Sequence, residues 1–154
     1  MPSGIGKGGR GGLEAASLYE WGGFNEAGER QFETFRPGWE QPIHSLLRET
    51  RVSVVFHGHD HFFAHQLLDG ITYQLVPQPA HQNHRKHHAE VYGYKSGTFI
   101  PNSGHIQVEV ASDKAVISYV RSMNNLLKRP SFENGDLAFS YEIEAKKKIM
   151  VSEK

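Results

Sequence analysis

The sequence contains no cysteine. A disulfide framework and a thiolate metal site are therefore both excluded, and the redox state of the compartment is left open. Long apolar runs are also absent, because no stretch approaches the roughly 20 residues of a membrane-spanning helix. The first twelve residues, MPSGIGKGGRGG, lack the apolar core of a signal peptide. The sequence thus indicates neither a transmembrane segment nor a secretion signal, and it leaves the localisation unknown.

The chain also lacks an excess of either positive or negative charge. The chain has 17 basic and 17 acidic side chains and a formal net charge of zero. Because nucleic acids and anionic membranes select basic proteins, the composition indicates neither partner. Apolar residues make up 38% of the 154 residues, and nine Phe, six Tyr and two Trp supply large side chains for one domain. We expect Trp21 and Trp39 to be packing residues.

Helices and loops are expected in the first third of the chain. Half of residues 1–12 are glycine, which predicts a flexible segment. The helix formers at 13–21 predict a short helix that ends at Gly22-Gly23. The polar stretch 25–40 predicts a loop. Residues 41–50 predict a second helix with Pro42 near its first turn. Its expected apolar face comprises Ile43, Leu46 and Leu47.

Strands are expected from residue 51 onward. RVSVVF, residues 51–56, is a β-branched run without polar alternation, which is typical of a strand buried on both faces. The pair Asp69-Gly70 separates two strand-like runs and predicts a hairpin over residues 63–76. A chain that passes from helix and loop to a buried strand indicates the α/β class.

The last half of the chain is expected to be β-rich. Residues 77–104 predict a long loop, and residues 105–122 predict a second hairpin. A last strand is expected over residues 137–145, followed by a frayed basic tail at 146–154. We see no internal repeat and no domain boundary, so residues 1–154 are interpreted as a single domain.

Histidine is the residue in unusual supply. The chain has ten, and nine lie between His44 and His88. We expect His44 on the surface of the second helix. The stretch HQNHRKHH, residues 81–88, is interpreted as a solvated loop, with a basic edge beside a phosphate-binding mouth as the alternative.

The stretch HGHDH follows the predicted strand 51–56, where α/β folds place their chemistry. Gly58 is expected to supply the turn. If the segment is extended, His59 and His61 point the same way and Asp60 points away, where it could orient a ligand. Imidazole suits Zn, Fe, Mn or Ni, with carboxylates as the usual co-ligands. His57 lies within the strand, so we expect a hydrogen-bonded core residue, or one that supports the site from behind, rather than a metal ligand.

Gly58-His59-Asp60-His61 after a β-branched strand resembles the last signature block of the calcineurin-like metallophosphoesterases, relatives of the purple acid phosphatases. Further stretches are similar to a bacterial branch of that family: GRGGLEAASLYEWGG, RPGW, GHDHFFAHQLLDGITYQLVPQP and YGYKSG. The resemblance implies a four-layer α/β/β/α sandwich and two metal ions, Mn, Fe or Zn, that hydrolyse a phosphoester substrate. It implies that His59 binds one metal and His61 the other.

The chain also departs from the family pattern. The family blocks D-x-H, G-D, G-N-H-D/E and a lone His precede G-H-x-H, yet no Asp stands before Asp60, and Asn25 is not in a G-N-H context. The resemblance therefore implies the C-terminal portion of such an enzyme, a partial sandwich with an incomplete ligand set. Because such a portion lacks the first sheet, we expect one face and one edge of the strand at 51–56 to be exposed, and the chain to form homo-oligomers through it or to pair with a partner.

Weaker motifs leave alternatives open. Gly4, Gly6 and Gly9 satisfy G-x-G-x-x-G, but no strand precedes them as dinucleotide binding requires. Arg10 is a candidate phosphate contact or a flexible surface arginine. Besides the metal-dependent phosphoesterase, the sequence allows a non-catalytic chain that pairs with another, or a small histidine-rich metal-binding protein.

Overall fold

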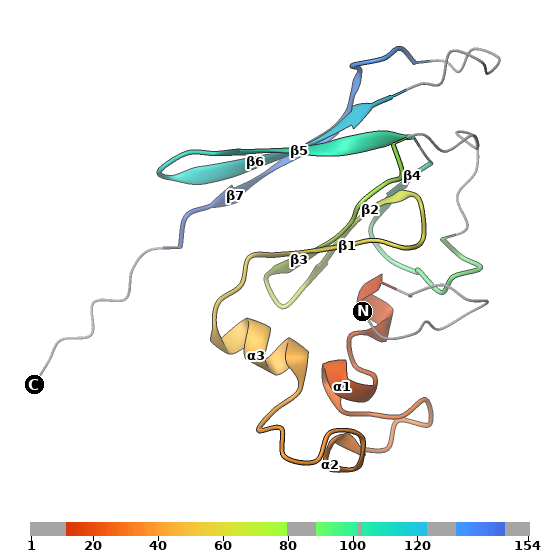
Figure 1. Cartoon of the computed structure of the whole chain (residues 1–154), viewed down its shortest axis with the longest axis vertical. Helices are drawn as coiled ribbons and strands as arrows, with labels where there is room; N and C mark the ends of the chain where they lie inside the picture. The colour runs from red at the N-terminus through yellow and green to blue at the C-terminus, as the bar shows by residue number, and fades with distance from the viewer. Residues whose placement is uncertain (1–11, 80–88, 102, 123–131, 147–154) are drawn as a thin grey trace, which may run out of the picture.

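The computed structural model describes residues 12–79, 89–101, 103–122 and 132–146. Within these residues the chain is a β-rich, mixed α/β structure with a four-stranded sheet, a three-stranded sheet and three short α-helices (Figure 1). The α/β class is therefore confirmed. The flexible segment predicted before Gly12, the histidine tract at 81–88 and the tail beyond Lys146 lie outside the described residues.

The first predicted helix, 13–21, is in fact two short pieces. They are the 3-10 helix η1 (Gly12–Ala15) and the helix α1 (Tyr19–Gly22). Tyr19 has a φ of 48°, so the backbone leaves the right-handed helical region and one continuous helix cannot form. The predicted end is confirmed, because Gly23 adopts a left-handed φ of 89° and its N–H donates to the Tyr19 carbonyl.

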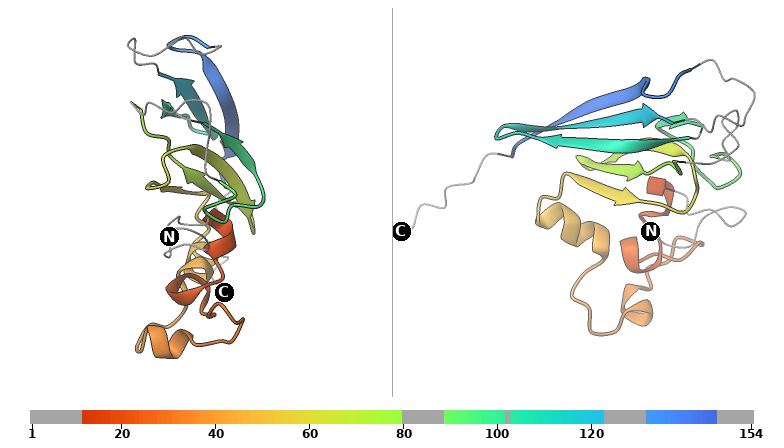
Figure 2. Two further views of the ribbon diagram at one scale, coloured as in Figure 1. Left: turned by 90° about the vertical axis from the view of Figure 1, so that its right-hand side faces the viewer. Right: turned by 45° about the horizontal axis from the view of Figure 1, so that its top comes forward.

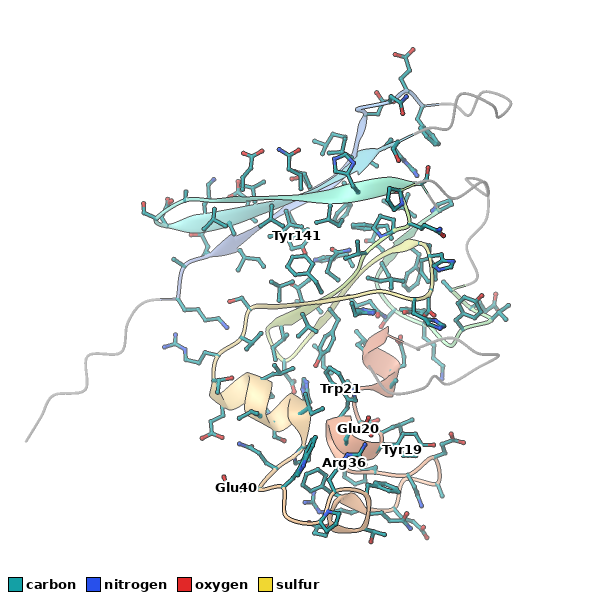
Figure 3. All side chains as sticks on the ribbon, in the orientation of Figure 1. Tyr19, Glu20, Trp21, Arg36, Glu40 and Tyr141 are labelled. Atoms are coloured by element: carbon teal, nitrogen blue, oxygen red, sulfur yellow. The ribbon has the colours of Figure 1, made fainter. Side chains whose placement is uncertain are left out.

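The stretch 25–40 is not a loop throughout, since it contains the single-turn helix α2 (Phe32–Phe35). Phe32 is buried and anchors this turn, and a Cβ at Gly23 would lie 2.9 Å from the Phe32 side chain. An ion pair of 3.6 Å joins Arg36, just after α2, to Glu20 in α1 (Figure 3). The burial of Phe32 therefore stabilises a helical turn in a stretch whose polar composition predicts a loop.

The second predicted helix is confirmed as α3 (Ile43–Glu49), which follows Pro42 directly. Its predicted apolar face is wrong in part, because Leu46 is 47% exposed while Leu47 packs against the cluster around Tyr73. Neighbouring helical positions lie about 100° apart, so both leucines cannot face the sheet. His44 is not on the surface either, because its Nδ1 lies 2.6 Å from the Tyr73 hydroxyl.

The four-stranded sheet has the strand order β1-β3-β2-β4. Its strands are β1 (Val54–His57), β2 (Phe63–Leu68), β3 (Ile71–Leu75) and β4 (Thr98–Ile100). Strands β2 and β3 form the predicted hairpin, with φ of 51° at Asp69 and 75° at Gly70. Residues 98–100, predicted as loop, instead pair with β2, and Phe99 packs against the aromatic cluster beneath it.

Strand β1 is an edge strand, parallel to β3. The prediction that it is buried on both faces is wrong, because Phe56 is 43% exposed. Val55 packs against the cluster of Ile71, Tyr73 and Trp21 under the helices. Val54 and Phe56 point to the other face, where described residues cover them only in part.

The three-stranded antiparallel sheet has the order β5-β6-β7. Its strands are β5 (Gly104–Val110), β6 (Lys114–Arg121) and β7 (Leu137–Glu144), which confirms the second hairpin and the last strand. Lys146 does not begin a frayed tail, because its Nζ donates to the Arg51 carbonyl over 2.7 Å.

The elements stack in three layers, helices, four-stranded sheet and three-stranded sheet (Figure 2). Between the sheets, Phe63 stacks on Tyr119 with ring centroids 4.7 Å apart. Tyr141 lies in the same interlayer, and its hydroxyl donates to Gln74 Oε1 over 3.1 Å (Figure 3). Among the described helices, none is long and apolar enough to cross a membrane.

Candidate metal centre

The histidine-containing loop, residues 58–62, connects β1 to β2 at the carboxyl end of the parallel pair β1 and β3 (Figure 1). The His57 carbonyl accepts a hydrogen bond of 2.7 Å from the Val76 N–H, so the pairing continues to the start of this loop. The predicted location at the carboxyl end of the sheet is therefore the observed one.

The backbone of this loop is not extended. His59 has a φ of 95° and His61 a φ of 60°, whereas Gly58 does not adopt a positive φ. The expected glycine turn is thus wrong, and so is the extended backbone, although the two histidines still lie at the surface and Asp60 between them is buried, as expected. The chain must reverse from β1, parallel to β3, into β2, antiparallel to β3, and the histidines themselves make that reversal. Left-handed backbone at non-glycine residues is costly and concentrates at functional sites.

Both histidines reach the surface, since the His59 side chain is 54% exposed and His61 is exposed. Asp60 between them is the reverse, with a fully buried side chain. Its Oδ1 lies 2.9 Å from His59 Nδ1, and its Oδ2 accepts a hydrogen bond of 2.8 Å from the Tyr94 hydroxyl. Asp60 therefore points inward and contacts the neighbouring imidazole, as a group that orients a ligand would.

His57 lies under the loop at the end of β1. Both of its ring nitrogens are buried, and neither has a hydrogen-bond partner within the part of the chain that the structure describes. Burial lowers the pKa of His57 to about 4, an effect that the charge of Asp60 partly opposes. A buried polar group without a partner costs free energy. The hydrogen-bonded core position expected for His57 is therefore wrong within the described residues, because the ring is buried but neither nitrogen is bonded.

The donor set at this loop fits part of a metal site. His59 and His61 offer two accessible imidazoles, the donor type that Zn, Mn and Fe accept in proteins. The described residues contain no group of three or more His, Asp or Glu that could hold a metal ion. Functional sites commonly use at least three protein ligands, so a metal at these two histidines would need at least one further donor.

Sequence reasoning did not identify Tyr94 as a neighbour of the histidine-containing loop. Tyr94 lies in the YGYKSG stretch and is buried against Phe62, with ring centroids 5.1 Å apart. Burial and the charge of Asp60 raise the pKa of Tyr94, so its hydroxyl remains a donor. Its contact with Asp60 spans 34 residues, and no local pattern signals it. Arg10 lies outside the described residues.

The two tryptophans have different environments. Trp21 packs on Tyr73 with ring centroids 6.4 Å apart, as expected of a packing residue. Trp39 is 51% exposed, and the Arg36 guanidinium lies 5.6 Å from its ring centroid. The packing role predicted for Trp39 is therefore wrong within the described residues, because the short helices leave its ring at the surface.

Comparison with known proteins gives no independent assignment for this loop. No family model matches the chain, and no curated protein matches it either.

Proposed function

We propose that this chain supplies the G-H-D-H part of a binuclear, metal-dependent phosphoester hydrolase of the calcineurin-like class. In this proposal His59 binds one metal and His61 the other. The observation that carries it is the loop itself, in which two surface histidines in left-handed conformation flank a buried Asp60 at the carboxyl end of parallel strands.

The architecture supports the proposal at the level of layers. Two packed sheets with helices on the outer face of one make three layers, in the order α/β/β. A four-layer α/β/β/α sandwich contains this order. The proposed fold is therefore a partial sandwich of that kind, with the loop at one end of its four-stranded sheet.

The chemistry follows from the donors. Two metal ions at such a site polarise phosphoryl oxygens and make bound water a nucleophile at neutral pH. This chain would bind them through His59 and His61, while Asp60 holds one of these rings. Arg10, whose planar fork suits a phosphate oxygen, stays a candidate substrate contact on sequence grounds alone.

Metal binding by the full chain tests the proposal. Isothermal titration with Zn²⁺ and Mn²⁺, together with metal analysis after gel filtration, should show binding that weakens in His59→Ala and in His61→Ala. His105→Ala, which removes an exposed histidine from β5, is the matched control and should bind like the wild type. Undiminished binding by the double variant H59A/H61A would instead favour a histidine-rich metal-binding protein that uses residues 81–88.

A second candidate function is association through β1. This strand pairs with β3 alone among the described strands, so its other edge offers backbone groups to a further strand. An apolar groove of about 410 Å³ lies beside it, lined in part by Val54, Phe56, Val108 and Val110.

A second copy of the chain fits this groove and edge. Ser53 and His57 direct their carbonyls to β3, so Val54 and Phe56 direct theirs outward. Antiparallel pairing of two β1 strands about Val55 would place Val54 opposite Phe56 of the other copy, a self-complementary apolar contact. The zero net charge adds no overall repulsion between copies.

A further inference from the structure

Asp60 is one link in a longer series of contacts. The Tyr94 hydroxyl donates to Asp60 Oδ2 over 2.8 Å, and Asp60 Oδ1 lies 2.9 Å from His59 Nδ1. Tyr94 itself is buried, and its ring packs edge-on against Phe62 and Phe99. A carboxylate only accepts hydrogen bonds, so the hydroxyl and the His59 Nδ1–H are both donors to Asp60.

The segment that carries Tyr94 is held by Glu14 of η1. One Glu14 oxygen accepts the backbone N–H groups of Lys95, over 2.7 Å, and of Ser96, over 2.9 Å. Its other oxygen accepts from the Gln66 side-chain amide over 3.0 Å, and that amide also donates to the Ser96 carbonyl over 2.6 Å. A charged acceptor with several donors strongly fixes the local backbone.

Gly12 shows how closely these segments approach. Its φ is 53°, and a Cβ built there would lie 1.9 Å from Gln66 Oε1 and 2.5 Å from the Tyr94 ring. No larger residue fits without displacing the tyrosine. The start of η1, strand β2 and the segment 94–97 therefore form one rigid support under the histidine-containing loop.

We propose that Tyr94, held by Glu14, is a positioning residue that fixes the His59 ring through Asp60. The inference rests on the proposed function, in which His59 is a metal ligand. With the proton held on Nδ1, the lone pair of His59 Nε2 is directed to the surface, where a metal can bind it. A carboxylate behind a ligating imidazole fixes the tautomer and raises the basicity of the metal-binding nitrogen.

The test measures the tautomer of His59 and the Zn²⁺ affinity of the chain in separate experiments. A long-range ¹H–¹⁵N spectrum of the metal-free full chain should show His59 predominantly as the Nδ1–H tautomer. In Tyr94→Phe and in Asp60→Asn we expect a mixture of tautomers and a Zn²⁺ affinity lower by about 10-fold, the lower end of the effect of such supporting groups. Glu14→Gln should act in the same direction, because Gln66 would then face a second amide.

Tyr141→Phe is the matched control. It also removes one tyrosine hydroxyl from a hydrogen bond, here to Gln74 between the sheets, and it should leave both readings at wild-type values. If His59 in Tyr94→Phe keeps the wild-type tautomer and Zn²⁺ affinity, the inference is overturned and the proposed function stands. If the wild type binds no metal, the proposed function fails, whatever the tautomer.

Discussion

At the scale of single residues, His44 forms a polar contact between α3 and the hairpin of β2 and β3. Its Nδ1 lies 2.6 Å from the Tyr73 hydroxyl, and its Nε2 lies 3.0 Å from Asp69 Oδ2. Arg48 of the same helix approaches that carboxylate to 3.5 Å. Burial raises the pKa of Tyr73 to about 12, helped by the charge of Asp69, so the hydroxyl stays neutral and needs a partner.

We predict that His44→Ala lowers the free energy of unfolding by about 1–3 kcal/mol, because it leaves the buried Tyr73 hydroxyl without its partner. Tyr73→Phe removes that hydroxyl together with its need for a partner. The double variant should therefore lose less than the sum of the two single losses. Urea unfolding monitored by tryptophan fluorescence measures all three. Strictly additive losses would mean that the contact contributes no coupling.

At the scale of elements, the hairpin and the histidine-containing loop reverse the chain in different ways. The turn between β2 and β3 uses left-handed backbone at Asp69 and Gly70, an arrangement that matches the twist of paired strands. The loop from β1 to β2 places left-handed backbone at His59 and His61 instead. The turn at Asp69-Gly70 suits the backbone preferences of its residues. The loop at His59 and His61 carries backbone strain, which the contacts of the buried Asp60 offset.

We predict that alanine destabilises the protein at one exposed glycine and has little effect at another. Gly70→Ala should lower the free energy of unfolding by about 1–2 kcal/mol, because the φ of 75° is unfavourable for any residue with a Cβ. Gly58→Ala should change it by less than about 0.5 kcal/mol, since a Cβ there meets nothing within 4 Å and φ is not left-handed. Chemical denaturation of both variants measures these changes. A larger loss of unfolding free energy in Gly58→Ala than in Gly70→Ala would contradict the described loop.

At the scale of the whole molecule, the proposed self-association rests on the edge strand β1 and the groove beside it. Strand β1 is open at one edge, and the apolar side chains of Phe56, Val108 and Val110 are exposed around the groove beside it. Proteins usually protect the free edge of a sheet by keeping the edge strand short, by placing charged side chains on it, or by covering it. Beside this edge, the histidine-containing loop carries His59 and His61, the two ligands of the proposed metal site.

We predict that the wild-type chain is a dimer by size exclusion with light scattering and that Phe56→Lys shifts it to monomer. The added charge would lie in the self-complementary contact. Leu67→Lys makes the same change at an exposed apolar residue of the inner strand β2 and should leave the dimer intact. A wild-type monomer at all concentrations would rule out pairing through β1.

We predict negligible hydrolysis of nitrophenyl phosphate by the chain alone, with Mn²⁺, Zn²⁺ or Fe²⁺ supplied. The reason is the ligand count, since no Asp precedes Asp60 and the described residues contain no group of three metal-binding side chains. Turnover is measured beside that of His59→Ala. Activity of the wild type that is lost in this variant would show that the chain completes a working site.

Several features follow from the sequence by itself because they depend on local backbone energetics. The Asp69-Gly70 pair specifies its turn, Gly23 ends α1, and the β-branched run around Val55 forms a strand. Each signal lies within a few residues of its effect. The position of the histidine-containing loop follows in the same way, since it comes directly after that strand.

Only the tertiary structure decided the rest. The place of β1 at the sheet edge depends on which strands pair with β3, and no local pattern encodes that. The left-handed backbone of His59 results from reversing the chain between two strands of one sheet. The contact of Tyr94 with Asp60 joins residues 34 positions apart. Such contacts form only when separate elements pack, so the local sequence around each residue does not predict them.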